Sequence, residues 1–361
     1  MTEANHTNGE AGTHRGPSKG KDGRVGITLV AEKSGVSPST VSRVINSSQN
    51  VSEEIRRRVL AVTEELGYVR LRKARQKKQY NVILVLIINS LNPYFHEMIV
   101  GIRERAALLG DSIVSVLDMD GFFEGRDFDW FIGYLRRESA KGLIVFSSAL
   151  SDPQIRAVRR LIDQPIVLVD HWIDEPGVFT VKIDYVTAMS QVALHLLKLN
   201  HTRIAHLVGR PGLSSTREKR EGIELGVRQF GREIALEHYS TDSPGVEWAF
   251  QTTMNLLSLP GEKRPTAILC DSDMLALGAL HAARSRQMHV PADVSVTGFD
   301  DIKMAIHANP PLTTVSPPKR EMGRIAIEMI AGIRNTNEQK IYTALESPLI
   351  VRDSTAPIAN A

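Results

Sequence analysis

The sequence lacks the features that would direct it to a membrane or out of the cell. Its 361 residues include one cysteine, Cys270, which cannot form an internal disulfide and lies in an apolar run typical of a buried, inert thiol. The longest strongly apolar run, Val82 to Ile88, is far shorter than the ~20 residues that cross a bilayer. Residues 1–24 lack the apolar stretch of a secretory signal. We therefore expect a cytoplasmic protein without a membrane segment.

The sequence also lacks the motifs of cofactor-dependent or hydrolytic enzymes. No Gly-x-Gly-x-x-Gly or Walker-type loop follows a predicted strand, and Gly209-Arg210-Pro211-Gly212 has the wrong spacing. The 11 histidines are scattered, and no metal-ligand spacing of the zinc kind occurs. Ser214 and Ser215 have no base beside them in the sequence that would activate a nucleophile. These absences predict a protein that is not an enzyme and holds no cofactor or metal.

Positive charge is present, and it is concentrated near the start of the chain. The whole chain carries a net charge of +3. Residues 24–80 hold 12 Lys or Arg against five Glu, a net of +7, so the remainder is slightly acidic. A basic head on a nearly neutral body fits contact with nucleic acid, although charge runs are more often simple solvated surfaces.

The length exceeds that of one typical domain, and the texture of the sequence changes twice. Residues 1–24 have no apolar periodicity and predict a disordered tail. Residues 25–69 predict short helices, and residues 70–80 a basic linker or hinge. From residue 81 onward, apolar runs of strand length alternate with amphipathic helices, as in parallel βαβ units. We expect strands near residues 82–88, 112–117, 142–147, 165–170, 204–208, 266–270 and 293–298.

The segment from Val30 to Asn46 has the chemistry of a helix-turn-helix. Gly35 permits the positive φ that a tight turn between two helices requires. Ser37 can cap the second helix, and Pro38 suits its first turn because its missing N–H costs nothing there. A third helix is expected to begin after Ser52 and to bury Ile55, Val59, Val62 and Leu66.

The second of these helices presents polar groups to a DNA major groove. If Val41, Val44 and Ile45 are buried, Arg43 points outward and can bind guanine with two parallel hydrogen bonds. The alternative is a three-helix bundle whose polar face has no ligand. The residues expected to contact DNA here are Ser37, Pro38, Ser39, Thr40, Ser42, Arg43 and Asn46.

These residues resemble the headpiece of the lactose-repressor/galactose-repressor (LacI/GalR) family of bacterial regulators. The resemblance runs from residue 26 to 355 and includes Val51-Ser52, Gly67-Tyr68, Asn92-Pro93-Tyr94-Phe95, Val169-Asp170, Asp273-Met274-Leu275-Ala276-Leu277-Gly278-Ala279, Gly298-Phe299-Asp300-Asp301 and Pro311-Leu312-Thr313-Thr314-Val315.

The resemblance implies a homodimer on a pseudo-palindromic double-stranded operator. It also implies an effector-binding domain of residues 81–355, similar to periplasmic sugar-binding proteins. Its two doubly wound parallel-sheet lobes would span about residues 81–183 with 319–346, and 184–318 with 347–355.

Two departures from the family pattern concern DNA binding. Gly26 stands where relatives cap the first helix with Thr or Ser, which is a stronger cap. In the hinge, Lys77 takes the place of the Leu that relatives insert into the minor groove. We expect Arg72, Arg75 and Lys77 to bind DNA mainly through charge, with steep salt dependence and a smaller bend.

By the same resemblance, a small polar effector lies between the lobes. The matching positions are Tyr94, Phe95, Asp170, Arg217, Ser272 and Asp300. Carboxylate and guanidinium groups grip hydroxyl or amide groups, so a sugar, a nucleoside or a similar metabolite is expected. Ser272 replaces the Asn of many sugar-binding relatives, and this weakens the transfer of any particular ligand.

Each of these assignments has a plainer alternative. Asp300 can be a turn or cap residue, and Arg217 can belong to a solvated helix face. Trp172 and Trp248 are more often core residues, although Trp172 follows Asp170 closely enough to line a cleft. For the whole chain, the alternative is a periplasmic-type solute-binding protein without a DNA function, which the headpiece and the missing export signal disfavour.

Overall fold

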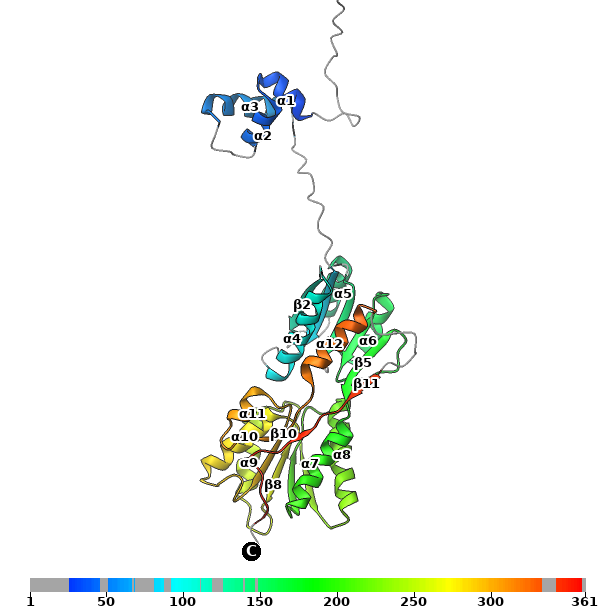
Figure 1. Cartoon of the computed structure of the whole chain (residues 1–361), viewed down its shortest axis with the longest axis vertical. Helices are drawn as coiled ribbons and strands as arrows, with labels where there is room; N and C mark the ends of the chain where they lie inside the picture. Colours follow the sequence, from blue (N-terminus) through cyan, green and yellow to red (C-terminus); the bar gives the residue numbers. More distant parts are fainter. Residues whose placement is uncertain are drawn as a thin grey trace, which may run out of the picture. The chain divides into compact units, whose positions relative to one another are not determined.

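The computed structural model describes residues 26–45, 51–66, 68, 81–87, 92–110, 112–118, 126–138, 140–146, 149–332 and 342–358. The chain divides into two compact units, Met1–Gln79 and Tyr80–Ala361, each of which is described by itself (Figure 1). The predicted tail at residues 1–24, the DNA-contact residue Asn46, and the hinge with Arg72, Arg75 and Lys77 lie outside the described residues.

The first unit contains the three predicted helices. They are α1 (Ile27–Ser34), α2 (Pro38–Ile45) and α3 (Glu53–Glu65). Gly35 ends α1 with a φ of 65°, as the turn requires. The Ser37 Oγ accepts a hydrogen bond from the Thr40 N–H at 3.1 Å, and the Ser52 Oγ accepts one from the Ile55 N–H at 3.5 Å. Gly26 provides no side-chain cap for α1.

The three helices share a small apolar core. Val30, Ala31, Val41, Val44 and Val59 are buried. Ile55, Val62 and Leu66, which the sequence predicts to be buried, are only partly so and pack against the edge of this core. The structure therefore confirms the helix-turn-helix and narrows its core to five fully buried side chains among the described residues.

The second unit begins with an α/β lobe, lobe 1. Its sheet has the strand order β11-β5-β4-β3-β1-β2. The strands are β1 (Asn81–Ile87), β2 (Ser112–Asp118), β3 (Gly142–Phe146), β4 (Ile166–Val169), β5 (Val178–Ile183) and β11 (Tyr342–Leu345). The helices are α4 (Pro93–Leu108), α5 (Arg126–Glu138), α6 (Asp152–Leu161) and α12 (Lys319–Ile330). All the strand pairs are parallel.

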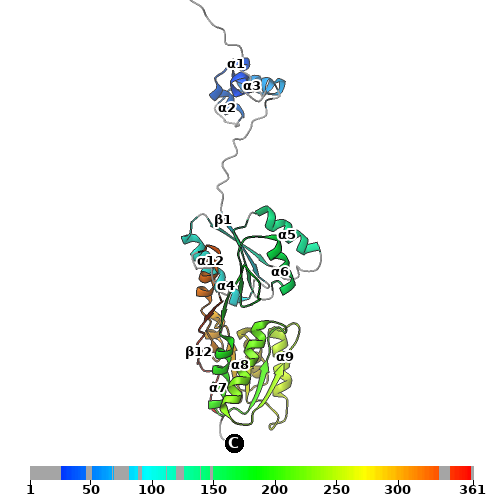
Figure 2. The ribbon, with the colours of Figure 1, turned by 90° about the vertical axis from the view of Figure 1, so that its right-hand side faces the viewer.

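Both faces of the lobe 1 sheet are covered, which accounts for the apolar run in β1. Figure 2 shows α4 and α12 on one side of this sheet and α5 and α6 on the other. Ile83, Val85 and Ile87 belong to the core beneath α4 and α12. Leu84 and Leu86 belong to the core beneath α5 and α6. Because both faces of β1 are covered, the side chains pointing to either face are apolar, and its sequence does not alternate between polar and apolar residues.

Lobe 2 repeats this architecture with one exception. Its strand order is β12-β10-β9-β8-β6-β7, and β12 pairs antiparallel with β10. The strands are β6 (Arg203–Leu207), β7 (Ala235–Tyr239), β8 (Ala267–Cys270), β9 (Ser295–Phe299), β10 (Thr313–Val315) and β12 (Leu349–Ile350). The helices are α7 (Tyr185–Lys198), α8 (Ser214–Phe230), α9 (Val246–Leu257), α10 (Asp273–Ser285) and α11 (Lys303–His307). The predicted doubly wound lobes are confirmed, with an antiparallel edge added.

Three crossovers join the lobes. The chain passes from β5 to α7, from β10 to α12 and from β11 to β12. One apolar core continues across the junction, since it includes Met98 and Met322 of lobe 1 together with Met189 and Phe299 of lobe 2. Each lobe thus has its own sheet, and one apolar core joins the two lobes.

Two glycines let α4 and α12 cross closely. A Cβ at Gly323 would meet the Met98 carbonyl oxygen at 2.1 Å, and one at Gly101 would meet the Arg320 carbonyl oxygen at 2.2 Å. We expect Gly323→Ala to lower the free energy of unfolding by about 1 to 3 kcal/mol, the typical cost of overpacking.

Calorimetry of the full chain measures this effect, and Gly133→Ala is the control. Gly133 lies in α5, and a Cβ added there would meet nothing within 4 Å, so alanine is expected to add up to about 1 kcal/mol of helix propensity. If Gly323→Ala and Gly133→Ala changed the free energy of unfolding by the same amount, the crossing of α4 and α12 would tolerate an added methyl group.

Candidate functional site

Helix α2 presents its polar residues to solvent. Ser37, Pro38, Ser39 and Arg43 are exposed, and Thr40 and Ser42 are half-buried. The hydroxyl groups of Ser39 and Thr40 lie 2.7 and 2.8 Å from that of Ser37, so the start of the helix is internally bonded. Arg43 forms no ion pair with a described residue, which leaves its planar fork of donors for a base edge.

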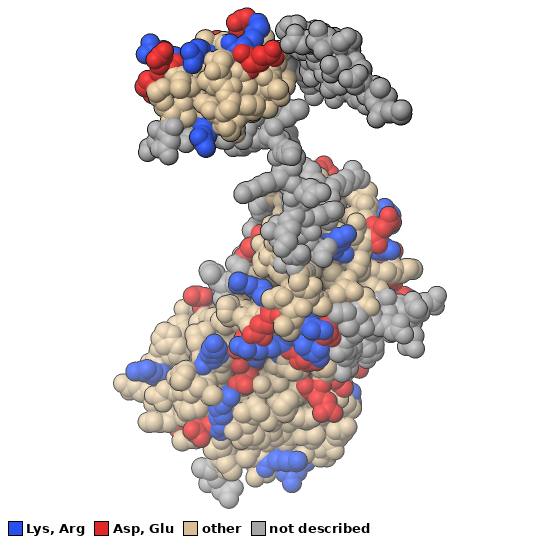
Figure 3. Space-filling view, turned by 45° about the horizontal axis from the view of Figure 1, so that its top comes forward, with Lys and Arg blue, Asp and Glu red and all other residues tan. Residues whose placement is uncertain are grey.

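The described headpiece carries balanced charge. Residues 26–68 contain five Lys or Arg and five Glu, and the basic excess of the chain's first part comes from Arg24 and residues 70–78. Figure 3 shows basic and acidic side chains beside one another on the visible face of this unit. The net positive charge of the chain's first part therefore comes from residues outside the described helices, and α2 exposes uncharged polar groups and Arg43.

A cavity of about 550 Å³ lies between the two lobes. Lobe 1 contributes the start of α4, and lobe 2 contributes the ends of its parallel strands and the helices that follow them, where ligands bind in open α/β sheets. The lining residues that carry polar groups are Asn92, Tyr94, Tyr185, Arg210, Ser215, Thr216, Lys219, Glu247, Asp271, Ser272 and Asp300.

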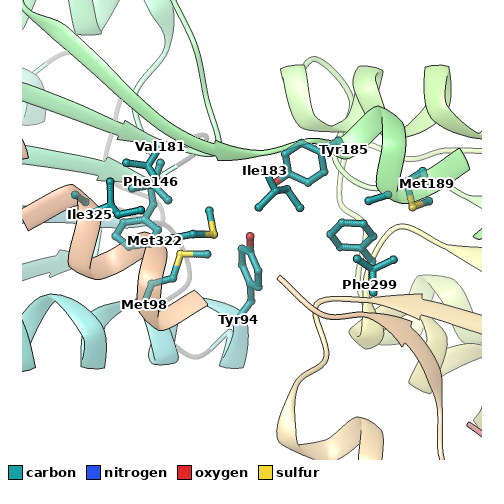
Figure 4. Close-up of a cluster of buried hydrophobic side chains, with 14 of the residues drawn as sticks. Tyr94, Met98, Phe146, Val181, Ile183, Tyr185, Met189, Phe299, Met322 and Ile325 are labelled. Carbon is teal, nitrogen blue, oxygen red and sulfur yellow. The ribbon is translucent and has the colours of Figure 1, made fainter. Parts of the chain in front are cut away.

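The N-terminus of α4 places an aromatic wall on the lobe 1 side. Asn92 caps the helix by accepting a hydrogen bond from the Tyr94 N–H at 3.0 Å, and Pro93 occupies the first turn. Phe95 packs against Tyr94, with ring centroids 5.5 Å apart. Figure 4 shows Tyr94 projecting from α4 toward Tyr185 and Phe299 at the lobe junction.

Asp170 lies one hydrogen bond away from the lining, at the end of β4. The Tyr94 hydroxyl donates to its Oδ2 at 2.6 Å, and its Oδ1 is buried without a partner. Burial raises the pKa of the Asp170 carboxyl, opposed by the nearby Tyr94 and Tyr185 hydroxyls and by the charge of Lys219. An unpartnered buried carboxylate oxygen is costly, and a ligand that donates a hydrogen bond would relieve this cost.

Asp300 follows β9 and also lines the cavity. Burial raises the pKa of its carboxyl well above the usual range, opposed by Lys219 and reinforced by Asp273. The Lys319 ammonium donates to the Asp300 carbonyl oxygen, and the next carboxylate, Asp301, pairs with Arg352 at 2.6 Å.

Backbone strain is concentrated at these strand ends. Five non-glycine residues of the described chain have a positive φ, and three of them are Asp170 (61°), Asp300 (114°) and Asp301 (47°). Strained backbone of this kind persists where the surroundings enforce it, often at binding sites.

The structure brings most of the predicted effector residues together. Tyr94, Phe95, Ser272 and Asp300 line the cavity, although the Ser272 hydroxyl also caps α10 by accepting from the Leu275 N–H at 3.3 Å. Arg217 is exposed on α8 and is not among the lining residues.

The two tryptophans also lie outside the lining. Trp172 is 46% exposed, and Trp248 packs against the apolar core of lobe 2.

Lys219, one of two cationic side chains among the described residues of the cavity lining, was not predicted from the sequence. Its ammonium donates to the Asp271 carbonyl oxygen at 2.6 Å and lies 3.9 Å from the centre of the Phe299 ring. Burial of such a charge is eased by the ring face and by the surrounding carboxylates. The signal was its place two residues after Arg217, on the opposite side of the same helix.

Ser214 has no base beside it in the sequence, but the fold places His171 next to it. His171 of lobe 1 has its Nδ1 3.4 Å from the Ser214 Oγ of lobe 2, and its Nε2 bonds to Asp152 at 2.7 Å. The Ser214 distance is longer than the ~2.6–3.2 Å of an activated nucleophile. A second contact between the lobes joins Lys182 and Glu218 at 2.7 Å. These contacts hold the lobes together beside the cavity.

Two further findings concern only the part of the chain that the structure describes. It contains no group of three His, Cys, Asp or Glu side chains placed to hold a metal ion. None of its helices combines the length and the apolar character that crossing a membrane requires.

Comparison with known proteins identifies both units. Residues 27–70 match the pattern of bacterial regulatory proteins of the lacI family, and residues 193–355 match the periplasmic binding protein-like domain. The repressor CytR of Escherichia coli is 30% identical over 330 residues, covering 90% of this chain and 95% of that protein. The chain belongs to the lacI family of bacterial regulatory proteins.

Other relatives in this family agree in length and in kind. The regulator DegA of Bacillus subtilis is 31% identical over 91% of this chain and 97% of its own length. The repressor PurR of Photobacterium profundum is 28% identical over 91% of this chain and 98% of its own length. These relatives of the lacI-family chain are transcriptional regulators by name.

Solved structures match the fold over nearly the whole chain. The Lac repressor dimer bound to operator and an anti-inducer has a TM-score of 0.65 at 28% identity, covering 92% of this chain and 99% of that one. The complex of the transcriptional regulator CelR with cellobiose has a TM-score of 0.65 at 25% identity, covering 92% of this chain and 100% of that one. This lacI-family chain is thus a DNA-binding transcriptional regulator with an effector-binding fold.

Proposed function

We propose that this regulator represses transcription from a pseudo-palindromic operator, and that a sugar or similar polar metabolite bound between its lobes controls its affinity for that operator. The observation that carries the effector assignment is the buried pair Asp170 and Tyr94 beside the cavity, with one carboxylate oxygen unpartnered. A hydroxyl-rich ligand supplies the donors that such oxygens accept.

The effector contacts come from both lobes. Tyr94 and Phe95 act from lobe 1 as lining residues, and Asp170 acts through its unpartnered Oδ1. Asp300, Ser272 and Lys219 act from lobe 2. Relatives with solved structures carry cellobiose or ribose, which have the expected chemistry. A ligand that contacts both lobes changes the balance between their open and closed arrangements, and operator binding must change ligand affinity by the same factor.

Operator contacts are assigned to the exposed face of α2 and to the basic residues beyond α3. Ser37, Ser39, Thr40, Ser42 and Arg43 of the described chain face the bases or the adjoining phosphates. Asn46, Arg72, Arg75 and Lys77 complete the set from the sequence. A protein that binds chromosomal DNA in this way works in the cytoplasm, and it acts by binding rather than by catalysis.

A second copy of the chain supplies the second headpiece. Lobe 1 exposes Leu108, Ile113 and Val116, and lobe 2 exposes Met304 and Ile306. The Lac repressor relative is a dimer on its operator, and we assign the same arrangement here.

A thermal-shift screen of the full chain tests the effector assignment. Cellobiose, ribose, other sugars and nucleosides are added singly, and a ligand at about 100 times its dissociation constant should add roughly 2.7 kcal/mol to the stability. Ligands that act must also change affinity for an operator selected from a random duplex pool. A panel without any stabilising compound, or a stabilising compound without effect on the selected duplex, would contradict the proposal.

A further inference from the structure

Lobe 2 contains a row of four titratable side chains that the effector contacts do not use. Asp271 follows β8 in the cavity wall, His206 lies on β6, His238 on β7 and Glu224 on α8. The side chains of His206 and Asp271 are 0% and 2% exposed. Ionisable side chains are rarely buried unless they are paired, so the partners of each one show what holds it in place.

The histidine rings are fixed by their nitrogen atoms. The Nε2 of His206 lies 2.9 Å from the Asp271 Oδ1, and its Nδ1 lies 2.8 Å from the Nδ1 of His238. A carboxylate only accepts, so the Nε2 of His206 donates. One proton fits between the two Nδ1 atoms, so one ring donates there and the other accepts. Glu224 lies 3.8 Å from the far nitrogen of His238.

Asp271 connects three segments of the cavity wall, namely its own segment after β8, the loop after β6 and helix α8. Its Oδ2 accepts from the Gly209 N–H at 2.7 Å, and its carbonyl oxygen accepts from the Lys219 ammonium at 2.6 Å. Burial alone would raise the pKa of the Asp271 carboxyl, but the charge and hydrogen bond of His206, with Lys219 and the Gly209 N–H, lower it. Asp271 is therefore an ionised anchor for the loop after β6 and for the cation on α8.

A purely structural need for this row is weak. The neighbouring strand residues Ala205, Leu207, Ile268 and Leu269 are buried and apolar. Replacing a buried ion pair by apolar side chains of similar volume is often neutral or stabilising. What an apolar pair cannot do is hold a carboxylate in one orientation at the cavity wall.

We propose that His206, backed by His238, is a positioning residue of the effector cavity, which orients Asp271 and through it fixes Lys219 and the Gly209 loop. An ammonium has three donors, and the Asp271 carbonyl uses one of them. The remaining donors of Lys219 are held ready for an acceptor oxygen of the ligand. Only this last role rests on the proposed function.

Competitive acetylation of the full chain tests the positioning without any effector. Trace acetic anhydride labels each lysine at a rate that mass spectrometry reads peptide by peptide, and the exposed Lys198 of α7 serves as internal reference. His206→Leu removes the donor to Asp271. We expect the rate at Lys219, relative to Lys198, to rise about fivefold, the change in population that the loss of one net hydrogen bond produces.

Two further variants separate positioning from general loosening. His206→Gln keeps a side-chain N–H for Asp271 and should return the Lys219 rate toward that of the wild type. His238→Leu removes only the backing ring, should raise the rate less, and takes the place of His206→Leu if that variant does not fold. An unchanged Lys219 rate, or an equal rise at Lys198, overturns the proposal.

The outcome is independent of the effector assignment. If labelling responds as expected and no sugar or nucleoside binds, the positioning row stands and the proposed effector class fails. If ligands bind and the labelling of Lys219 does not respond, the proposed effector class stands and the positioning role of His206 fails.

Discussion

Arg43→Ala is expected to lower the affinity for a selected operator by about 5- to 150-fold for each half-site. A bidentate contact with a base is worth about 1–3 kcal/mol of discrimination, and Arg43 is the exposed arginine of α2. Affinity for an unrelated duplex should fall much less, because it depends on the number of phosphate contacts. Fluorescence anisotropy with the selected and a scrambled duplex, at two salt concentrations, measures both quantities.

Two controls separate the hydrogen-bond pattern from the charge. Arg43→Lys keeps the charge and loses the planar fork, so it should resemble Arg43→Ala on the operator and the wild type on the scrambled duplex. Lys33→Ala removes a positive charge from α1, where it pairs with Glu65 at 3.0 Å between two exposed side chains. If Lys33→Ala cost as much specificity as Arg43→Ala, α2 would not be the reading helix.

Asp170→Asn is expected to stabilise the ligand-free protein and to abolish its response to the effector. The amide keeps an acceptor for the Tyr94 hydroxyl, tolerates the φ of 61°, and removes a buried charge. The ligand loses a hydrogen bond to a charged group, which is worth about 1.5–3 kcal/mol or roughly 10- to 150-fold in affinity. In thermal unfolding, the variant without ligand should therefore have a higher Tm than the wild type, and added ligand should raise its Tm less.

The stabilisation depends on pH in a defined direction. Because the folded-state pKa of Asp170 is raised, ionisation penalises the folded state once the pH exceeds the ordinary carboxyl pKa. The variant's advantage should be absent near the ordinary pKa of 3.8, grow as the pH rises, and become constant above the folded-state pKa. Asp174→Asn, an exposed site four residues away, is the control and should change neither property. A loss of stability in Asp170→Asn at neutral pH would show that its carboxylate is favourably solvated.

The elements that the sequence predicted are those whose signal is local. Gly35, Ser37 and Pro38 fix a turn and a helix start by their own chemistry, so the helix-turn-helix was predictable at residue level. Six of the seven predicted strands are largely buried apolar runs, and the seventh, β2, lies at the edge of its sheet and exposes Ile113 and Val116. The five unpredicted ones carry weaker signals: β7 exposes Ala235 and Glu237, β5 contains Lys182, and β10, β11 and β12 have two to four residues each.

Site residues that directly follow a strand could be predicted from the sequence. Site residues whose direction depends on how helices pack could not. Asp170 and Asp300 each follow an apolar run; Asp300 lines the cavity, and Asp170 is bonded to Tyr94, which lines it. The choice between Arg217 and Lys219 depends on the rotation of α8. Gly222 and Gly226 set this rotation, because a Cβ at either position would meet α7 at 2.4 and 2.9 Å. The contacts of Asp271, His206, His238 and Glu224 join β6, β7, the segment after β8 and α8, and no spacing along the chain predicts them.

The three crossovers have a consequence for the order in which the protein is made. Lobe 1 needs α12 and β11, and lobe 2 needs β12, so both sheets wait for segments beyond residue 318. The headpiece needs only helices that end at residue 65. On the ribosome the DNA reader can therefore fold while its sensor is still incomplete, and the ability to respond to a metabolite arrives only with the last strands.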